Sequence, residues 1–533
     1  MLFNSYEFIF AFLPATLAVF FLLGERSRSL ALGWLVVASL FYYAWWRPLN
    51  VAIIAPSIAV NYVLARWLLA LRAQGSNGAV ANWVLALGIV FNVCFLAYFK
   101  YLNFFAVAIN DIAGTNFVLE RIVLPLGISF ITFQKIAFLI DVHGRRVESF
   151  TLRDYALFVF FFPQLIAGPI VHYREVMPQF HAASCRYDRE NLALGLTLFV
   201  FGLFKKVVLA DGIAEHVTPI YEAAAGGAQV SLLPAWIAAV GFTLQIYFDF
   251  SGYSDMALGL GRCVGVKLPP NFDSPLKSTN IIDFWLRWHM TLTRFLTAYL
   301  YNPLVLWLTR RRIARRLPVL GGKRTSAGAF LQLLGGPTLL TMFVSGLWHG
   351  AGYLFIAWGV LHGLYLVINH AWRQVGPRLW PSKDIYARIM RPVGFVLTFL
   401  AVAVAMVLFR SANGIAASEL LQGMAGLNGV RVPQALYDVL GPLKALVAVS
   451  AEFSTQALAI ASAWVAVLLS VALALPNTLQ FMARYEPALL VNKKPGRILD
   501  WNPSLAWATG IAVLAAASIM KLGGKSEFLY WQF

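Results

Sequence analysis

Two histidines lie within the same short pattern, G-x-x-H-G, in an apolar part of the sequence. The first stretch is Gly346-Leu347-Trp348-His349-Gly350 and the second is Gly359-Val360-Leu361-His362-Gly363. Because imidazole takes up a proton near neutral pH, either histidine could remove a proton from a hydroxyl group. Glycines four residues apart also let helix backbones pack closely, so a hydrogen-bonded packing residue is the alternative, and it is favoured for His362. Trp348 and the adjacent glycine-rich break make His349 the catalytic candidate.

A second candidate for a catalytic residue lies in the stretch from Asp283 to Leu292. Asp283 and Arg287 are four residues apart with the acid first, a spacing that favours an ion pair on one helix face. We expect this pair to be mainly structural. His289 follows two residues later among aromatic side chains. It is a catalytic candidate, with an ordinary interfacial histidine as the alternative.

Two carboxylates, Asp249 and Asp255, lie six residues apart. Such a pair could act as general acid and base or bind a metal. At about 100° per residue they diverge on a regular helix, so a shared metal is not predicted unless Gly252 breaks that helix. We expect both carboxylates to support neighbouring helices or site residues.

The elements that position these residues are apolar helices. The chain has 533 residues, of which 60% are hydrophobic and 12% charged, against about 25% charged in soluble proteins. Its apolar blocks reach the length of about 20 residues that spans a bilayer. The fold predicted is all-α and polytopic, with roughly 11 to 13 hydrophobic helices by the usual window criterion. Clear examples are Leu30–Trp46, Trp83–Phe99, Val393–Phe409 and Gln456–Leu475.

Charge and cysteine content exclude other classes. The net charge of +18 is typical of basic cytoplasmic loops in a membrane protein, so no nucleic-acid partner is predicted. The three cysteines are scattered among apolar residues, which indicates neither a disulfide framework nor a metal site. Membrane lipid is the expected surrounding of the chain.

Basic loops predict how the histidine region crosses the membrane. Lys and Arg are retained on the cytoplasmic side, which places Arg310–Arg324 and Arg373–Arg391 inside. The apolar stretch Leu331–Val367 between them must therefore enter the membrane from the cytoplasmic side and return to that side. Its glycine-rich midpoint, Ser345–Gly352, favours an interrupted helix, and irregular backbone at membrane depth must be buried in protein or line a cavity. His349 is predicted on such a cavity, deep in the membrane or toward its outer side.

Taken in order, several motifs resemble the membrane-bound O-acyltransferase family, in the branch of the alginate O-acetylation and teichoic-acid D-alanylation membrane proteins. The resemblance covers nearly the whole chain. It is carried by Met1–Ser5, Tyr42–Trp46, Tyr98–Tyr101, Leu124–Phe133, Phe162–Ile170, Phe204–Lys206, Tyr247–Asp255, Phe284–Leu292, Gly346–Gly350 and Phe528–Phe533.

The resemblance implies that His349 is the essential histidine of the family and that His289 occupies its second conserved polar position. It implies one transmembrane domain over residues 1–533 around a central funnel, with a core of about 90–410 and C-terminal spans at 455–475 and 503–520. It also implies a bacterial inner-membrane enzyme that takes acetyl groups from cytoplasmic acetyl-CoA, without a tightly bound cofactor. Its expected partners are an extracytoplasmic acetyltransferase and a polysaccharide synthesis complex.

One segment departs from the alginate-type pattern. The acidic residue expected near Ala298 is absent, and a long arginine run follows. This departure suggests a subgroup that serves another exopolysaccharide or the cell wall.

The resulting hypothesis is an O-acetyltransferase in which His349 removes the proton of an acceptor hydroxyl while His289 orients the reacting groups. Trp348, Asp249, Asp255, Asp283 and Arg287 are expected to support them. Two alternatives are a transporter of polysaccharide or lipid-linked sugar and a membrane glycosyltransferase. A transporter often shows internal repeats, and a glycosyltransferase would be expected to carry an early acidic motif; neither is evident.

Overall fold

Helices dominate the structure because a bilayer offers no hydrogen-bond partners to an exposed backbone. In the computed structural model, nine helices of the described residues are long and apolar enough to cross a membrane. Two shorter apolar helices, α2 (Arg28–Ala44) and α24 (Leu505–Lys521), add to these. The predicted all-α, polytopic fold is confirmed. The nine long helices and the two shorter ones make 11 apolar helices in the described residues, the lower end of the predicted range of 11 to 13.

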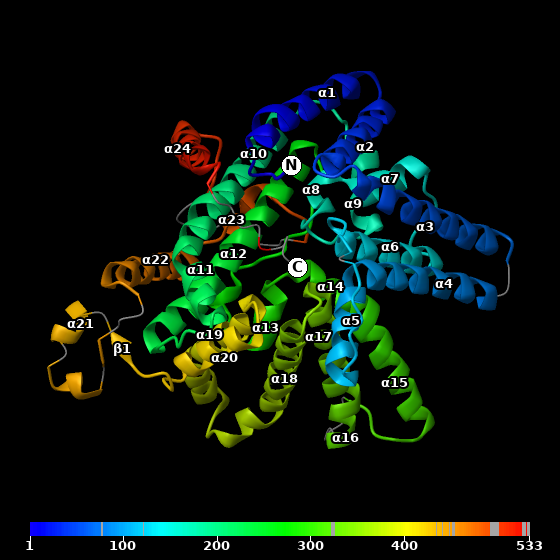
Figure 1. Cartoon of the computed structure of the whole chain (residues 1–533). Helices are drawn as coiled ribbons and strands as arrows, with labels where there is room; N and C mark the ends of the chain where they lie inside the picture. Colours follow the sequence, from blue (N-terminus) through cyan, green and yellow to red (C-terminus); the bar gives the residue numbers. More distant parts are fainter. Residues whose placement is uncertain are drawn as a thin grey trace. The chain divides into compact units, whose positions relative to one another are not determined.

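The structure describes residues 1–75, 78–120, 122–320, 326–432, 434–439, 441–446, 448–449, 453–490, 500–524 and 529. The end of the predicted basic run Arg310–Arg324 and most of the terminal motif Phe528–Phe533 lie outside these residues. The chain divides into two compact units, which are described separately (Figure 1).

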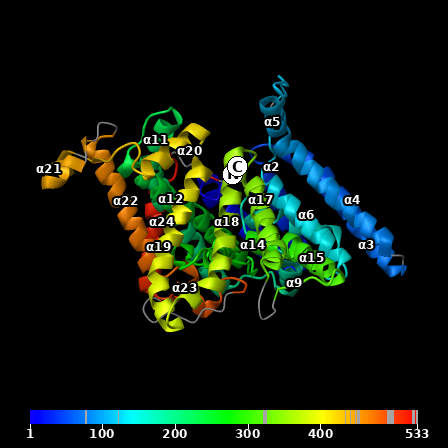
Figure 2. The same cartoon turned by 90° about the horizontal axis from the view of Figure 1, so that it is seen from below.

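The first unit comprises residues 1–204, 252–270 and 478–524. Its long helices α3 (Leu49–Ala73), α4 (Gly78–Leu96) and α6 (Ile128–His143) pack side by side, as Figure 2 also shows. Buried amides of Asn61 on α3 and Asn92 on α4 bond each other reciprocally, at 3.2 and 2.6 Å. Its helices are η1 (Phe8–Phe12), α1 (Leu13–Arg26), α2, α3 (Leu49–Ala73), α4 (Gly78–Leu96), η2 (Ala97–Tyr101), α5 (Leu102–Ala113), α6 (Ile128–His143), α7 (Leu152–Phe160), α8 (Phe162–Leu165), α9 (Tyr173–Ala182), α10 (Arg189–Phe204), the end of α12, α23 (Thr478–Phe481), η9 (Ala483–Tyr485) and α24.

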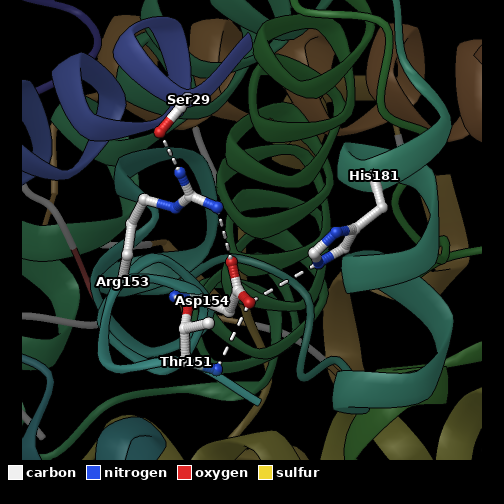
Figure 3. Close-up of polar contacts among 5 residues, drawn as sticks. All are labelled: Ser29, Thr151, Arg153, Asp154 and His181. Carbon is white, nitrogen blue, oxygen red and sulfur yellow. Dashed lines mark hydrogen bonds and ion pairs between the residues drawn. The ribbon is translucent and has the colours of Figure 1, made fainter. Parts of the chain in front are cut away.

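A polar cluster at the start of α7 joins three helices of this unit (Figure 3). Thr151 and Asp154 form a capping box, in which each side chain accepts the other residue's backbone N–H. Arg153 reaches Ser29 on α2 at 2.7 Å and the Asp154 carboxylate at 3.5 Å. His181 of α9 approaches the same carboxylate at 3.7 Å. This buried carboxylate therefore both starts α7 and ties it to its neighbours.

The second unit comprises residues 205–251, 271–477 and 525–533. Its core is apolar and aromatic, and most of α12 is buried. Its elements are η3 (Lys205–Ala210), α11 (Asp211–Ala225), the first part of α12 (Leu232–Cys263), η4 (Pro275–Lys277), α13 (Ile281–Arg287), α14 (Met290–Leu296), η5 (Thr297–Tyr301), α15 (Asn302–Ala314), α16 (Ala327–Phe330), η6 (Leu331–Gly335), α17 (Gly336–His349), α18 (Tyr353–Val375), η7 (Gly376–Leu379), α19 (Lys383–Arg410), α20 (Gly414–Met424), β1 (Arg431–Val432), α21 (Gln434–Val439), η8 (Gly441–Leu446), β2 (Ala448–Val449) and α22 (Thr455–Ala474).

Candidate active site

The two G-x-x-H-G stretches lie on α17 and α18, which form a closely packed antiparallel hairpin. A Cβ atom on Gly346 would lie 2.3 Å from the backbone oxygen of Phe355, and one on Gly359 would lie 2.4 Å from that of Met342. The glycines therefore bring the two backbones together, as the pattern predicts.

His349 is the last residue of α17. The chain then takes an extended conformation at Gly350 and Gly352, with φ of −161° and −167°, before α18 starts at Tyr353. The predicted interruption is confirmed, and its form is a turn between two helices. The His349 side chain is buried.

His289 lies at the junction of α13 and α14 in a left-handed conformation, with φ 42° and ψ 52°. Non-glycine residues rarely adopt this region, and it persists where the surroundings hold it. Asn271 supplies those surroundings. Its backbone oxygen accepts the Met290 N–H at 2.9 Å, and its side-chain oxygen accepts the Thr291 hydroxyl at 2.5 Å.

The same Asn271 oxygen lies 3.2 Å from Nδ1 of His289. Since this oxygen already accepts from Thr291, it acts as acceptor here too, and the proton is assigned to Nδ1 of His289. Nε2 then carries the lone pair. Complete burial lowers the pKa of His289 below its ordinary value, so its imidazole is neutral at physiological pH.

The two predicted catalytic histidines meet, although they are 60 residues apart in the sequence. Their ring centroids are 6.3 Å apart. Trp348 lies beside both, at 5.8 Å from the His289 ring and 4.9 Å from the His349 ring. Phe250 covers His289 at 4.7 Å and Phe409 covers His349 at 5.2 Å. The arrangement is a pair of imidazoles within an aromatic enclosure.

His362 belongs to the same enclosure, one turn beyond Trp358 on α18. Trp358 lies 5.1 Å from the His349 ring and 4.9 Å from the His362 ring. Nδ1 of His362 accepts a hydrogen bond from the indole of Trp285 at 3.3 Å. This contact fits the favoured interpretation of His362 as a hydrogen-bonded packing residue.

The charged residues predicted to support the site have partners of their own. Asp283 and Arg287 form the expected ion pair at 2.9 Å. Gly252 does not break α12, and the two carboxylates of this helix fall in different units. Asp249 pairs with buried Lys206 at 2.5 Å, whereas Asp255 accepts the Thr478 hydroxyl at 2.7 Å. None of these contacts joins the histidine pair directly.

Comparison with known proteins agrees with this architecture. A model of the membrane-bound O-acyltransferase family matches residues 82–320, which include His289. A peptidoglycan O-acetyltransferase of Helicobacter pylori is 39% identical over 458 residues, 81% of each chain. A probable alginate O-acetylase AlgI of Pseudomonas aeruginosa is 35% identical over an alignment of 575 positions that covers 100% of each chain.

The chain belongs to the membrane-bound O-acyltransferase family. It is an acyltransferase and a multi-pass membrane protein, which decides against the transporter and glycosyltransferase alternatives. A more distant relative is a teichoic acid D-alanyltransferase of Streptococcus thermophilus, 29% identical over 297 residues, which are 53% of this chain and 68% of that one.

Sequence patterns missed three residues of this candidate site. Asn271, Trp358 and Phe409 contact the two histidines, yet no motif singled them out. The one available signal was for Asn271, a polar residue directly after Pro269-Pro270 in the loop that follows α12. Trp358 and Phe409 are indistinguishable from the many other aromatic residues of apolar helices, and only the tertiary packing identifies them.

Proposed function

We propose that this O-acyltransferase passes acetyl groups from acetyl-CoA on the cytoplasmic side to a hydroxyl acceptor that leads to an extracytoplasmic bacterial polysaccharide. The observation that carries the proposal is the meeting of His289 and His349 inside one aromatic enclosure. Two imidazoles at this separation can both approach a single hydroxyl and the acyl carbon that it attacks.

In the proposed reaction, His349 takes the proton of the acceptor hydroxyl as the oxygen attacks the thioester carbonyl carbon. The carbon–sulfur bond then breaks, and the proton passes from His349 to the departing thiolate, giving an acetyl ester and free CoA thiol. General acid–base catalysis of this kind contributes about 10²–10⁴-fold to a rate. Neutral His289, fixed by Asn271, offers its Nε2 lone pair to a second O–H or N–H group of the substrates, other than the hydroxyl that reacts, and so orients them. The aromatic rings exclude water that would hydrolyse the thioester.

The relatives support acetyl transfer and a cell-envelope acceptor. Two of them are named as O-acetylating proteins, one for peptidoglycan and one for alginate. The missing acidic residue near Ala298 favours a polymer other than alginate. The basic loops, including Arg310–Arg316, would attract the phosphates of the donor. An inner-membrane location and an extracytoplasmic acetyltransferase partner complete the proposal.

The test is acetyl transfer from labelled acetyl-CoA by purified protein carrying His349→Ala. We expect the rate to fall about 10²–10⁴-fold while membrane insertion and thermal unfolding remain normal. The matched control is His370→Ala, a histidine of α18 outside the enclosure, which should keep normal transfer. Normal acetyl transfer by His349→Ala would refute the proposed role of this histidine.

A further inference from the structure

A surface groove of about 900 Å³ lies in the second unit between α13, α18 and α19. Pockets that bind small molecules have volumes of about 300–1,000 Å³, so this groove has room for a large ligand. Figure 2 shows α18 and α19 running next to each other along their lengths. Neither histidine of the proposed catalytic pair lines the groove.

One end of the groove is basic and aromatic. Arg373 and Trp372 come from the end of α18, and Arg391 and Tyr386 from the start of α19. Neither arginine forms an ion pair with a residue in the described part of the chain. Basic loops mark the cytoplasmic side, and Trp and Tyr gather where a membrane meets water. Basic pockets between helices at that level bind anionic lipid head groups.

The other end of the groove is apolar. It is lined by Leu286, Ile368, Leu397 and Ala401, and the hydroxyl of Thr398, which also lines it, donates to the Gly394 backbone oxygen at 2.6 Å. Along α19 the groove extends from Tyr386 to Ala401, which is 15 residues or about 22 Å at 1.5 Å per residue. One leaflet of a bilayer, with its head groups, is about 20–22 Å thick. The groove therefore matches one lipid molecule in length and in the order of its polar and apolar parts.

Two further polar residues of the groove, Asp283 and Asn369, are compatible with an anionic ligand. Asp283 is an acidic residue of the lining, and its carboxylate is neutralised by Arg287 at 2.9 Å. Asn369 lies between the basic and the apolar end, and its buried side-chain oxygen has no hydrogen-bond partner in the described part of the chain. A glycerol hydroxyl or an amine of a lipid could donate to that oxygen.

We propose that this groove binds one anionic phospholipid of the cytoplasmic leaflet. Its phosphate lies between Arg373 and Arg391, and one acyl chain follows Ile368 and Leu397 toward Ala401. The bound lipid holds α18, the helix that carries Trp358, against α19. This binding is independent of the proposed acetyl transfer.

The test is binding of phosphatidylglycerol to full-length detergent-purified protein, measured by native mass spectrometry without an acyl donor. Arg373→Ala combined with Arg391→Ala should weaken binding about 30-fold. Ala401→Phe, which fills the apolar end without changing charge, should weaken it as well. The matched control is Arg388→Ala, an exposed α19 arginine outside the groove, which should bind normally.

Three results would overturn the proposal. The first is unchanged phosphatidylglycerol binding by both groove variants. The second is equal binding of phosphatidylcholine, which has no net charge. The third is displacement of the lipid by acetyl-CoA in proportion to its concentration, which would make the groove a donor site. Single Arg373→Gln and Arg391→Gln variants keep the test decisive if the double variant unfolds, since each should bind more weakly than wild type.

Discussion

The contact between α17 and α18 at Gly346 allows a sharp test of how the hairpin positions His349. Gly346→Ala would place a Cβ atom 2.3 Å from the backbone oxygen of Phe355 and 3.2 Å from the Cα atom of Gly359. Ordinary contact begins at 3.4 Å, so the helices must separate by at least 3.4 − 2.3, or about 1.1 Å. His349 follows three residues later on α17, and its ring contact with Trp358 of α18 would open.

The expected magnitudes follow from this displacement. Overpacking costs about 1–3 kcal/mol, and alanine returns about 0.5–1 kcal/mol of helix stability relative to glycine. The net loss in the free energy of unfolding is therefore between about 0 and 2.5 kcal/mol, measured by thermal unfolding in detergent. Since a misplacement of about 1 Å can cost about 10²-fold in rate, acyl transfer from labelled donor should fall by that order.

Gly328→Ala is the matched control, because a Cβ atom there meets nothing within 4 Å. It should leave activity unchanged and stability equal or slightly higher. The reasoning is refuted if Gly346→Ala transfers acyl groups at the wild-type rate. It is also refuted if both alanine variants lose activity equally, since the loss would then not depend on the interhelical contact.

Two further predictions concern buried polar pairs. Asn61→Leu should lower the free energy of unfolding by about 0.6–1.7 kcal/mol, as for other hydrogen bonds within membranes. Asn92→Leu should lower it less in the Asn61→Leu protein than in the wild type, because the bond between the two amides is already lost. Additive losses in thermal unfolding would contradict this coupling. Asp249→Asn leaves buried Lys206 without one of its two carboxylates, and it should lower the free energy of unfolding by about 3 kcal/mol. Asp283→Asn removes one partner of a partly exposed ion pair, and it should lower the free energy of unfolding by about 0.2–1 kcal/mol. Equal losses would show that burial does not set the strength of these pairs.

Much of the fold was predictable because membrane insertion depends on length and hydrophobicity, which are local properties. The predicted blocks Trp83–Phe99 and Val393–Phe409 fall within helices able to cross a membrane, and Gln456–Leu475 extends one residue beyond such a helix, α22 (Thr455–Ala474). Leu30–Trp46 largely corresponds to α2, which has 17 residues. The interruption after His349 and the Asp283–Arg287 pair were predictable for the same reason, since glycine runs and i, i+4 spacing act within one or two turns.

The meeting of His289 and His349 was proposed from family resemblance, because nothing local brings together two residues 60 positions apart. Their contact depends on how α13, α14 and the α17–α18 hairpin pack. Periodicity and charge predict each element but not its neighbours. The partition of the chain into two units with α12 shared between them was likewise not visible in composition.

The chemistry of His289 depends on a residue that carries no catalytic signal of its own. Asn271 holds the left-handed backbone at His289 and accepts from Nδ1, so the lone pair of the ring is on Nε2. Leucine at position 271 would remove both the clamp and the tautomer preference, whereas aspartate would keep an acceptor. A neutral imidazole in this tautomer accepts a hydrogen bond through Nε2, so it can hold a second O–H or N–H group of the substrates and leave the proton of the reacting hydroxyl to another base. The mechanism proposed above gives proton removal to His349 and orientation to His289, so that each of the two histidines has a separate role.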